Sequence, residues 1–312
     1  MSSFAQKIAK KTKRDIDIAY RKAMARKVCY LFLLPYAIAF LTFNIIPVVI
    51  SIYYSFTYYN VLEPPKFIGL QNYINLILAD DIFLIAVKNT FVLAVITGPV
   101  GYIMSFLFAW FINELPRYIR AIAVLVFYAP TIAGSVYTIF AILFSSDGNG
   151  WVNGWLMELG ITQGPIMWLS DPSMMMKVII GVILWMSLGA GFLSFVAGLQ
   201  GVDRAQYEAG YVDGVSNRWQ ELWYITLPNM KPMLLFGAVM AITQSFGVGA
   251  VTQMLCGFPS TDYAAHTVIN HLTDFGSVRF DMGYASAIAT LLFLAMILSN
   301  KLVQYFLRRV GT

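Results

Sequence analysis

Apolar residues are concentrated in six long blocks of the chain. The blocks cover residues 28–57, 89–113, 121–145, 178–200, 232–256 and 283–300, and none of them contains Asp, Glu, Lys or Arg. The hydrocarbon core of a bilayer is about 30 Å thick, and a helix of about 20 apolar residues crosses it. The pattern therefore predicts an all-α, polytopic membrane protein with six transmembrane helices. Pro35, Pro47 and Pro130 lie inside these blocks and predict kinks or interruptions.

The composition agrees with a membrane protein. Of the 312 residues, 59% are hydrophobic and 12% are charged, whereas about 25% of the residues of an ordinary soluble domain are charged. So few charges cannot cover a water-soluble fold of this length, which argues against a soluble enzyme, a nucleic-acid-binding domain and a disordered protein. The two cysteines, Cys29 and Cys256, lie in apolar blocks, so we expect neither a disulfide framework nor a metal site.

The distribution of basic residues predicts the orientation. Nine of the 21 lysines and arginines lie in residues 1–27, and 17 of the 21 lie on the inner side if both chain ends are placed there. Basic residues gather on the cytoplasmic side of membrane proteins, so we expect both termini inside. Residues 1–27 form either a basic interfacial helix or a solvated leader, and residues 28–312 form the transmembrane domain.

The absence of charge in the six blocks limits how transport can be driven. Carriers driven by protons or ions commonly have an ionisable side chain within the membrane, and this sequence has none in its blocks. The dipeptide Gly-Lys never occurs, so the phosphate-binding loop G-x-x-x-x-G-K-[ST] is absent. Energy for active transport would therefore come from another subunit, and an uncharged path suits a neutral polar solute. An ion-coupled secondary carrier of such a solute is the alternative.

The largest inner segment between two blocks is residues 203–231. Residues 205–212 and 218–224 predict two short helices, because Asp213-Gly214 can stop the first of them. Two short helices on a turn would make a rigid knob for a partner, with Glu208 available to pair with a basic residue. An ordinary folded loop is the alternative.

The same segment resembles the signature of the permeases of binding-protein-dependent ABC importers. That signature runs E-A-A, three residues, Gly, about nine residues and then I-x-L-P, and here it reads Glu208-Ala209-Gly210, Gly214 and Ile225-Thr226-Leu227-Pro228. Gly210 replaces the second alanine, from which we expect a looser docking helix. Ten residues separate Gly214 from Ile225, which leaves the register after Gly214 open by one residue.

Further segments resemble the carbohydrate-uptake branch of this family, which takes up oligosaccharides and glycerol phosphates. They are F-I-G-L-Q-N-Y at 67–73, Asn89-Thr90, F-Y-A-P at 127–130, D-G-N-G-W-V-N at 147–153, W-L-S-D-P at 168–172 and A-G-L-Q at 197–200. The resemblance covers nearly the whole chain and implies the fold of a type I importer permease.

The resemblance also implies partners and a location. The partners would be a second homologous permease subunit in a heterodimer, two cytoplasmic ATPase subunits that bind Mg-ATP, an extracytoplasmic solute-binding protein, a carbohydrate substrate and the lipid bilayer, with no nucleic acid. The chain would be a multi-pass protein of the bacterial cytoplasmic membrane, without a cofactor or catalytic residues of its own. Its ATPase-docking residues would be Glu208, Ala209, Gly210, Asp213 and Gly214.

Sugars are held by hydrogen bonds and aromatic stacking, so amides, hydroxyls and rings inside the blocks are candidates for the solute path. In the family, the spans on either side of the docking loop line a central cavity. The candidates here are Gln244, Ser245, Trp185, Ser187, Tyr128 and Tyr137. Gln244 lies 12 residues beyond Pro232, which is about 18 Å along a helix and hence near the midplane. Either another helix bonds its amide there, or water and solute do.

One predicted outer loop, residues 257–282, holds a cluster of ionisable side chains. They are Asp262, His266, His271, Asp274, Arg279 and Asp281. His266 and His271 are five residues apart, which places them on different faces of a helix. We therefore expect a polar loop able to touch the binding protein rather than a metal site. A membrane-embedded enzyme that uses this cluster is a second alternative.

Overall fold

The computed structural model describes residues 27–133, 136–148 and 150–307. The chain divides into two compact units, Met1–Tyr53 and Tyr54–Thr312. Residues 1–26, nearly all of the basic leader, lie outside the described residues, so the choice between an interfacial helix and a solvated leader stays a prediction.

The described part of the first unit, from residue 27 onwards, is one apolar helical segment. Val28–Tyr54 is a helical segment of 27 residues with a mean hydropathy of 2.1, long enough to cross a bilayer. It comprises α2 (Lys27–Phe40), the π-helical turn η1 (Leu41–Ile45) and α3 (Ile46–Tyr54). Pro47 has no N–H to donate, and the wider turn directly before it accommodates the missing hydrogen bond. The predicted interruption thus occurs near Pro47, whereas α2 continues through Pro35.

The second unit begins with a small antiparallel sheet. In it β1 (Thr57–Tyr58) pairs with β2 (Lys66–Phe67), with Thr57 opposite Phe67. The first apolar block was predicted to be helical up to residue 57, but the helix ends at Tyr54. The prediction was wrong at this end because the aromatic and β-branched residues that follow Tyr54 are as compatible with a strand as with a helix.

Helices make up most of the rest of the second unit. In chain order they are α4 (Gln71–Leu78), α5 (Asp81–Asn113), α6 (Arg117–Ile132), α7 (Val136–Leu143), α8 (Trp151–Glu158), α9 (Pro172–Trp185), α10 (Ala190–Gln200), α11 (Arg204–Val212), α12 (Arg218–Glu221), η2 (Leu222–Thr226), α13 (Leu227–Asn229), α14 (Lys231–Phe246), α15 (Gly249–Cys256), η3 (Thr261–Tyr263), α16 (Val268–Thr273), η4 (Asp274–Val278) and α17 (Met282–Leu307).

Among the described residues, four helical segments are long and apolar enough to cross a membrane, and up to six are if two bent pairs each count as one span. The four are Val28–Tyr54, α5, Pro172–Gln200 and α17, and the bent pairs are α6 with α7 and Arg218–Asn229 with α14. The predicted apolar blocks are therefore helical, with six spans as the upper count.

Besides the first block, the third, fourth and fifth blocks are interrupted. In the third block α6 ends at Ile132, two residues after Pro130, as that proline predicts. The fourth block breaks between Trp185 and Ala190, and the fifth breaks between Phe246 and Gly249. Neither of these two breaks contains a proline, and both are departures from the uninterrupted helices that the sequence predicts.

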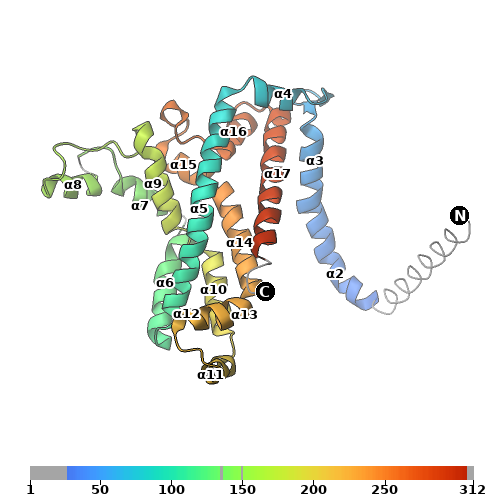
Figure 1. Ribbon diagram of the computed structural model, residues 1–312. Coiled ribbons are helices and arrows are strands. Elements are labelled where there is room, and N and C mark those ends of the chain that lie inside the picture. Colours follow the sequence, from blue (N-terminus) through green and yellow to red (C-terminus); the bar gives the residue numbers. More distant parts are fainter. Residues whose placement is uncertain (1–26, 134–135, 149, 308–312) are drawn as a thin grey trace, which may run out of the picture. The chain divides into compact units, whose positions relative to one another are not determined.

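Helix α5 is the central support of the second unit. It packs against α10 and α14 over one part of its length and against α9 and α16 over another. In Figure 1, the short helices α11–α13 lie at one end of this bundle, and α4 and α16 lie at the opposite end. We call these the docking end and the outer end.

The core of the docking end depends on close contacts at glycine. Phe192 and Phe195 of α10 are fully buried there, in a cluster that also contains Phe106 of α5. A Cβ atom added to Gly237 of α14 would lie 2.3 Å from Cζ of Phe195. Only a residue without a side chain fits at this crossing, as in other close-packed membrane helices.

We predict that Gly237→Ala destabilises the protein, because the added methyl group would force the Phe195 ring or one of the helices to move. Overpacking of this kind costs about 1–3 kcal/mol, which should appear as a lower Tm of the purified protein in detergent. Gly181→Ala in α9 is the matched control, because a Cβ there would have no neighbour within 4 Å. An equal Tm for the two variants would contradict the packing argument.

Candidate functional site

We call the whole of segment 203–231 the docking element. Its first helix forms where the sequence predicts it. Helix α11 covers Arg204–Val212, and the carboxylate of Asp203 caps it by accepting a hydrogen bond from the Ala205 N–H at 3.0 Å. The helix ends before Gly214, whose φ of +93° lies in the left-handed region that glycine favours.

The second helix of the docking element is longer than predicted. It begins at Arg218 after the Asn217 cap, but it continues past Tyr224 through η2 to Asn229. Pro228 lies in the first turn of α13, and the π-helical turn η2 precedes it, as η1 precedes Pro47. The chain then turns by 81° into α14.

Gly210 packs tightly within the docking element. This glycine is buried, and a Cβ on it would lie 2.6 Å from Cδ1 of Ile225. The Gly210 carbonyl also accepts a hydrogen bond from the Val215 N–H at 2.9 Å. Gly210 therefore brings α11 close to η2, which differs from the looser docking helix that we expected from its replacement of alanine.

Buried charge fixes the second docking helix to the bundle. Glu221 is 5% exposed; its carboxylate accepts hydrogen bonds from the Tyr211 hydroxyl at 2.5 Å and from Arg218 at 2.7 Å. Arg218 also reaches the carboxylate of Glu114, at the end of α5, at 2.9 Å. Burial acts to raise the pKa of Glu221, but the hydrogen bonds from Tyr211 and Arg218 outweigh it and hold that pKa below its usual value. Glu221 is therefore an ionised anchor.

The outer surface of the docking element exposes the predicted residues together with apolar ones. Glu208, Ala209, Asp213 and Gly214 are exposed, whereas Gly210 is buried. Large apolar side chains are exposed beside them, namely Tyr211, Val212, Trp219, Trp223 and Tyr224. The sequence does not single out these residues, because aromatic residues are common throughout the chain and only the fold shows which of them are exposed.

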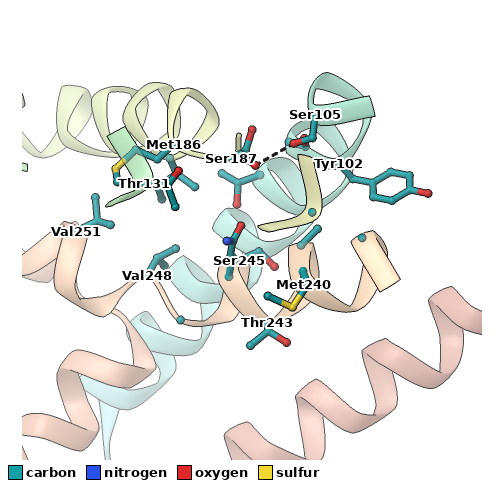
Figure 2. Close-up of a pocket in the computed structure, with 18 of the residues that line it drawn as sticks. Tyr102, Ser105, Thr131, Met186, Ser187, Met240, Thr243, Ser245, Val248 and Val251 are labelled. Carbon is teal, nitrogen blue, oxygen red and sulfur yellow. Dashed lines mark hydrogen bonds between the residues drawn. The ribbon is translucent and has the colours of Figure 1, made fainter. Parts of the chain in front are cut away.

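A cavity of about 340 Å³, with a largely apolar wall that also carries polar side chains, lies in the middle of the bundle. Helices α5, α6, α7, α9, α10, α14 and α15 contribute to its wall, and no residue of that wall carries a formal charge. Its polar side chains are Thr97, Tyr102, Ser105, Thr131, Tyr137, Ser187, Thr243, Gln244 and Ser245. Figure 2 labels six of them, on several different segments: Tyr102, Ser105, Thr131, Ser187, Thr243 and Ser245.

Four of the six predicted solute-path residues line this cavity. They are Gln244, Ser245, Ser187 and Tyr137. Trp185 and Tyr128 are not among the lining residues, and Trp185 is 56% exposed. Thr97, Ser105 and Thr131 were not among the predicted residues, because the sequence does not show towards which side of its helix a single hydroxyl in an apolar block points.

The break between α9 and α10 supplies part of the cavity wall. The Ser105 hydroxyl lies 2.7 Å from the carbonyl of Gly101 in its own helix and 2.9 Å from the carbonyl of Ser187, the dashed line in Figure 2, and the Thr131 hydroxyl donates to the carbonyl of Leu188 at 3.2 Å. The Ser187 carbonyl also accepts a hydrogen bond from the Gly189 N–H at 2.8 Å. Lipid could supply none of these bonds. Hydroxyls from α5 and α6 thus stabilise an irregular segment at the cavity, and they are no longer free to donate to a solute.

Gln244 differs from these hydroxyls. Within the described part of the chain its amide has no hydrogen-bond partner, and it lies close to the broken segment, since a Cβ on Gly189 would be 3.0 Å from its Nε2. An amide both donates and accepts. The cavity therefore offers a neutral polar molecule one unused amide, and it offers an ion no opposite charge.

The outer end is fixed by a buried polar network. Asp80, the cap of α5, accepts hydrogen bonds from the Phe83 N–H at 2.9 Å and the Tyr284 hydroxyl at 2.9 Å, and it lies 3.0 Å from Nε2 of His271. Nδ1 of His271 lies 3.3 Å from Nε2 of His266. If His271 donates to the Asp80 carboxylate, its Nδ1 accepts from His266, and both rings are neutral.

The geometry of this network indicates that it stabilises the fold. His266 and His271 are each 2% exposed, and burial lowers the pKa of both, to about 4 for His266, where the nearby His271 adds to the effect. Within the described ranges, no three His, Cys, Asp or Glu side chains are placed to hold a metal ion. The cluster ties the loop to α5 and α17.

Comparison with known proteins identifies the chain. The family model for the inner membrane component of binding-protein-dependent transport systems matches residues 99–312. The chain belongs to this family. It is thus a multi-pass membrane component of a transport system rather than an enzyme.

Relatives of this permease include several ABC transporter permeases. It is 31% identical over 266 residues to the probable ABC transporter permease protein YesP of Bacillus subtilis, covering 83% of this chain and 84% of that one. It is 28% identical over 284 residues to the arabinooligosaccharide transport permease AraP of the same organism, covering 90% and 88%. It also resembles a chain of a bacterial alginate ABC importer, with a TM-score of 0.77 and 24% identity over 94% of this chain and 99% of that one. The permease thus has the type I ABC importer fold.

We predict that the permease loses stability as the pH falls from about 6.5 towards 4. Because the pKa of His266 is about 4 in the folded protein and 6.5 is the ordinary value, the unfolded chain binds the proton first in this window, which favours unfolding. Tm measured across this range should fall, and His266→Phe, which keeps a ring between Phe258 and Tyr263, should reduce the slope. Parallel curves for the two proteins would contradict this assignment.

Proposed function

We propose that this permease is one of two homologous membrane subunits of an ATP-driven importer that carries a sugar, most simply a neutral oligosaccharide. The observation that carries the sugar assignment is the uncharged cavity, whose wall presents hydroxyls and the unused amide of Gln244. A neutral polyhydroxylated solute can bind there without leaving a buried charge unpaired. The names of relatives agree, since AraP transports arabinooligosaccharides and LacF of Rhizobium radiobacter transports lactose.

The proposed topology has six spans with both termini in the cytoplasm. The bent pair α6 with α7 supplies the third span, and α14, which follows the docking element after a turn of 81°, begins the fifth. Basic residues then lie mainly on the docking side, as the positive-inside rule requires. The location follows as the cytoplasmic membrane of a bacterium, with the docking element in the cytoplasm and the His266 network outside.

The proposed partners follow from that topology. Two ATPase subunits, which bind Mg-ATP, dock on the exposed face around Glu208, Ala209, Asp213 and Gly214, with Gly210 packed beneath it. An extracytoplasmic binding protein delivers the solute, by analogy with the bacterial alginate transporter, which has been crystallised in complex with a periplasmic protein that holds an alginate pentasaccharide. ATP binding shifts the permease pair between inward-facing and outward-facing states by its different affinity for the two.

We predict that Glu208→Lys prevents the ATPase subunits from copurifying with the permease. The substitution reverses the charge of an exposed side chain on α11 that makes no side-chain hydrogen bond or ion pair with the described residues, so membrane insertion should be normal. Glu158→Lys is the control, because Glu158 is also exposed but lies on α8. Gly214→Pro should have the same effect as Glu208→Lys, since proline cannot adopt a φ of +93°.

The docking assignment is wrong if Glu208→Lys copurifies with the ATPase and supports normal uptake. The wider proposal would fail on a different observation. Vesicles that contain the permease pair without ATPase and nucleotide should not accumulate sugar, and accumulation there would show that the energy does not come from the proposed partners.

We predict that Gln244→Ala weakens the apparent affinity for the transported sugar in ATP-dependent uptake. Loss of one hydrogen bond costs about 1 kcal/mol, so the change should be about fivefold per bond. Gln253→Ala is the matched control, because Gln253 lies on α15 outside the cavity wall. Uptake of lactose and of arabinooligosaccharides should be compared, and unchanged behaviour with every sugar that is transported would remove Gln244 from the path.

A further inference from the structure

A second cavity, of about 790 Å³, lies at the docking end of the bundle. Its wall comes from the corner between α5 and α6, from the end of α10 and from the inward side of the docking element. It is distinct from the central cavity, with which it shares no lining residue. The transport path described above does not use it.

The charge of this second cavity is unbalanced. Four arginines line it, Arg117, Arg120, Arg204 and Arg218, against two glutamates, Glu114 and Glu221. Arg218 pairs with both glutamates, at 2.9 and 2.7 Å. With four arginines and two glutamates, the wall keeps a net positive charge of two.

The remaining arginines differ in their partners. Arg120 donates to the backbone and side-chain oxygens of Asn113. Arg117 and Arg204 have no hydrogen-bond or carboxylate partner among the described residues. Two cations in a concave wall without counter-ions attract an anion.

The position of the cavity identifies the kind of anion. The spanning helices α5 and α10 end at this cavity, at Asn113 and Gln200, so it lies at the depth of the lipid headgroups. Trp110, in the last turn of α5, forms part of the wall and contacts the ring of Trp219 at 5.4 Å between centroids. Tryptophan is enriched at this level of membrane proteins.

An apolar surface leads away from the cavity along α6. Tyr118, Ile119 and Ile122, which follow Arg117 on this helix, are 84%, 54% and 63% exposed. A phosphate held by Arg117 would therefore have a surface for acyl chains beside it. A soluble anion has no apolar part to place against this surface, whereas a phospholipid has acyl chains that can pack against it.

We propose that the cavity binds the phosphate group of an anionic phospholipid through Arg117 and Arg204. Basic pockets between membrane helices on the cytoplasmic side are suited to such headgroups. Arg117 begins α6 and Arg204 begins α11, so the lipid links the docking element to the bundle beside the bond between Arg218 and Glu114. The proposal rests on the proposed function only in assigning the lipid to the cytoplasmic leaflet.

Native mass spectrometry of the purified full chain tests this proposal. The chain is titrated with phosphatidylglycerol, with phosphatidylcholine, which has the same phosphodiester but no net charge, and with inorganic phosphate. Wild type should retain phosphatidylglycerol preferentially, and Arg117→Gln with Arg204→Gln should weaken that binding about thirty-fold. This corresponds to about 2 kcal/mol at 1.4 kcal/mol per factor of ten, or about 1 kcal/mol for each arginine.

Lys301→Gln is the matched control, because it removes a positive charge from α17 outside the cavity, and it should leave the binding unchanged. A second measurement needs no variant. Phosphatidylglycerol binding to wild type should weaken as salt rises, since salt screens exposed charges, and phosphatidylcholine binding should not.

Three results would overturn the proposal: equal retention of the two lipids, unchanged phosphatidylglycerol binding in the double glutamine variant, or binding of inorganic phosphate at these arginines with no preference for phosphatidylglycerol. The last would assign the site to a soluble anion. Binding is measured without ATPase, so failure of the docking assignment does not affect the outcome.

Discussion

The structure depends on hydrogen bonds that stabilise the breaks in its membrane helices. Lipid offers no hydrogen bonds, so backbone carbonyls freed by a break must find partners in the protein or in an internal cavity. Here, at the break before α10, the Ser187 carbonyl accepts from the Gly189 N–H and from the Ser105 hydroxyl, and the Leu188 carbonyl accepts from the Thr131 hydroxyl. The bonds from Ser105 and Thr131 hold α5 and α6 against the irregular segment. Met186 and Ser187 of this segment form part of the wall of the central cavity.

Short hydrogen bonds between helices require backbones that approach closely, and glycine provides that approach. A Cβ on Gly101 would lie 2.9 Å from Cβ of Ser187, so the residue one turn before Ser105 on α5 must be small for the bond from Ser105 to form. Gly237 plays the same part opposite Phe195 on the other side of the cavity. The hydrogen bond from Ser105 and the packing of Phe195, both at the cavity wall, thus each depend on a glycine in the facing helix or one turn away.

These principles also explain what the sequence could predict. The spans and α11 were predictable, because long uncharged blocks, the Asp203 cap and Gly214 act locally. The break at 186–189 was not, because its stability comes from Ser105 and Thr131, which are distant in sequence. Trp185 illustrates the limit: it ends α9 with an exposed side chain, whereas Ser187, two residues further in the break, lines the cavity. A block that is apolar on every side does not show which face is inward.

The docking element and the cavity belong to the same mechanical unit. Only Met230, which is 1% exposed, separates α13 from α14, and it packs in the same cluster as Phe195 and Leu222. A close-packed interior transmits displacement instead of absorbing it. Any rotation of the docking element therefore acts on α14, which carries Gln244, and through Glu114 on α5, which carries Ser105. In the proposed mechanism, a force applied at the docking end would therefore act directly on two of the helices that line the central cavity.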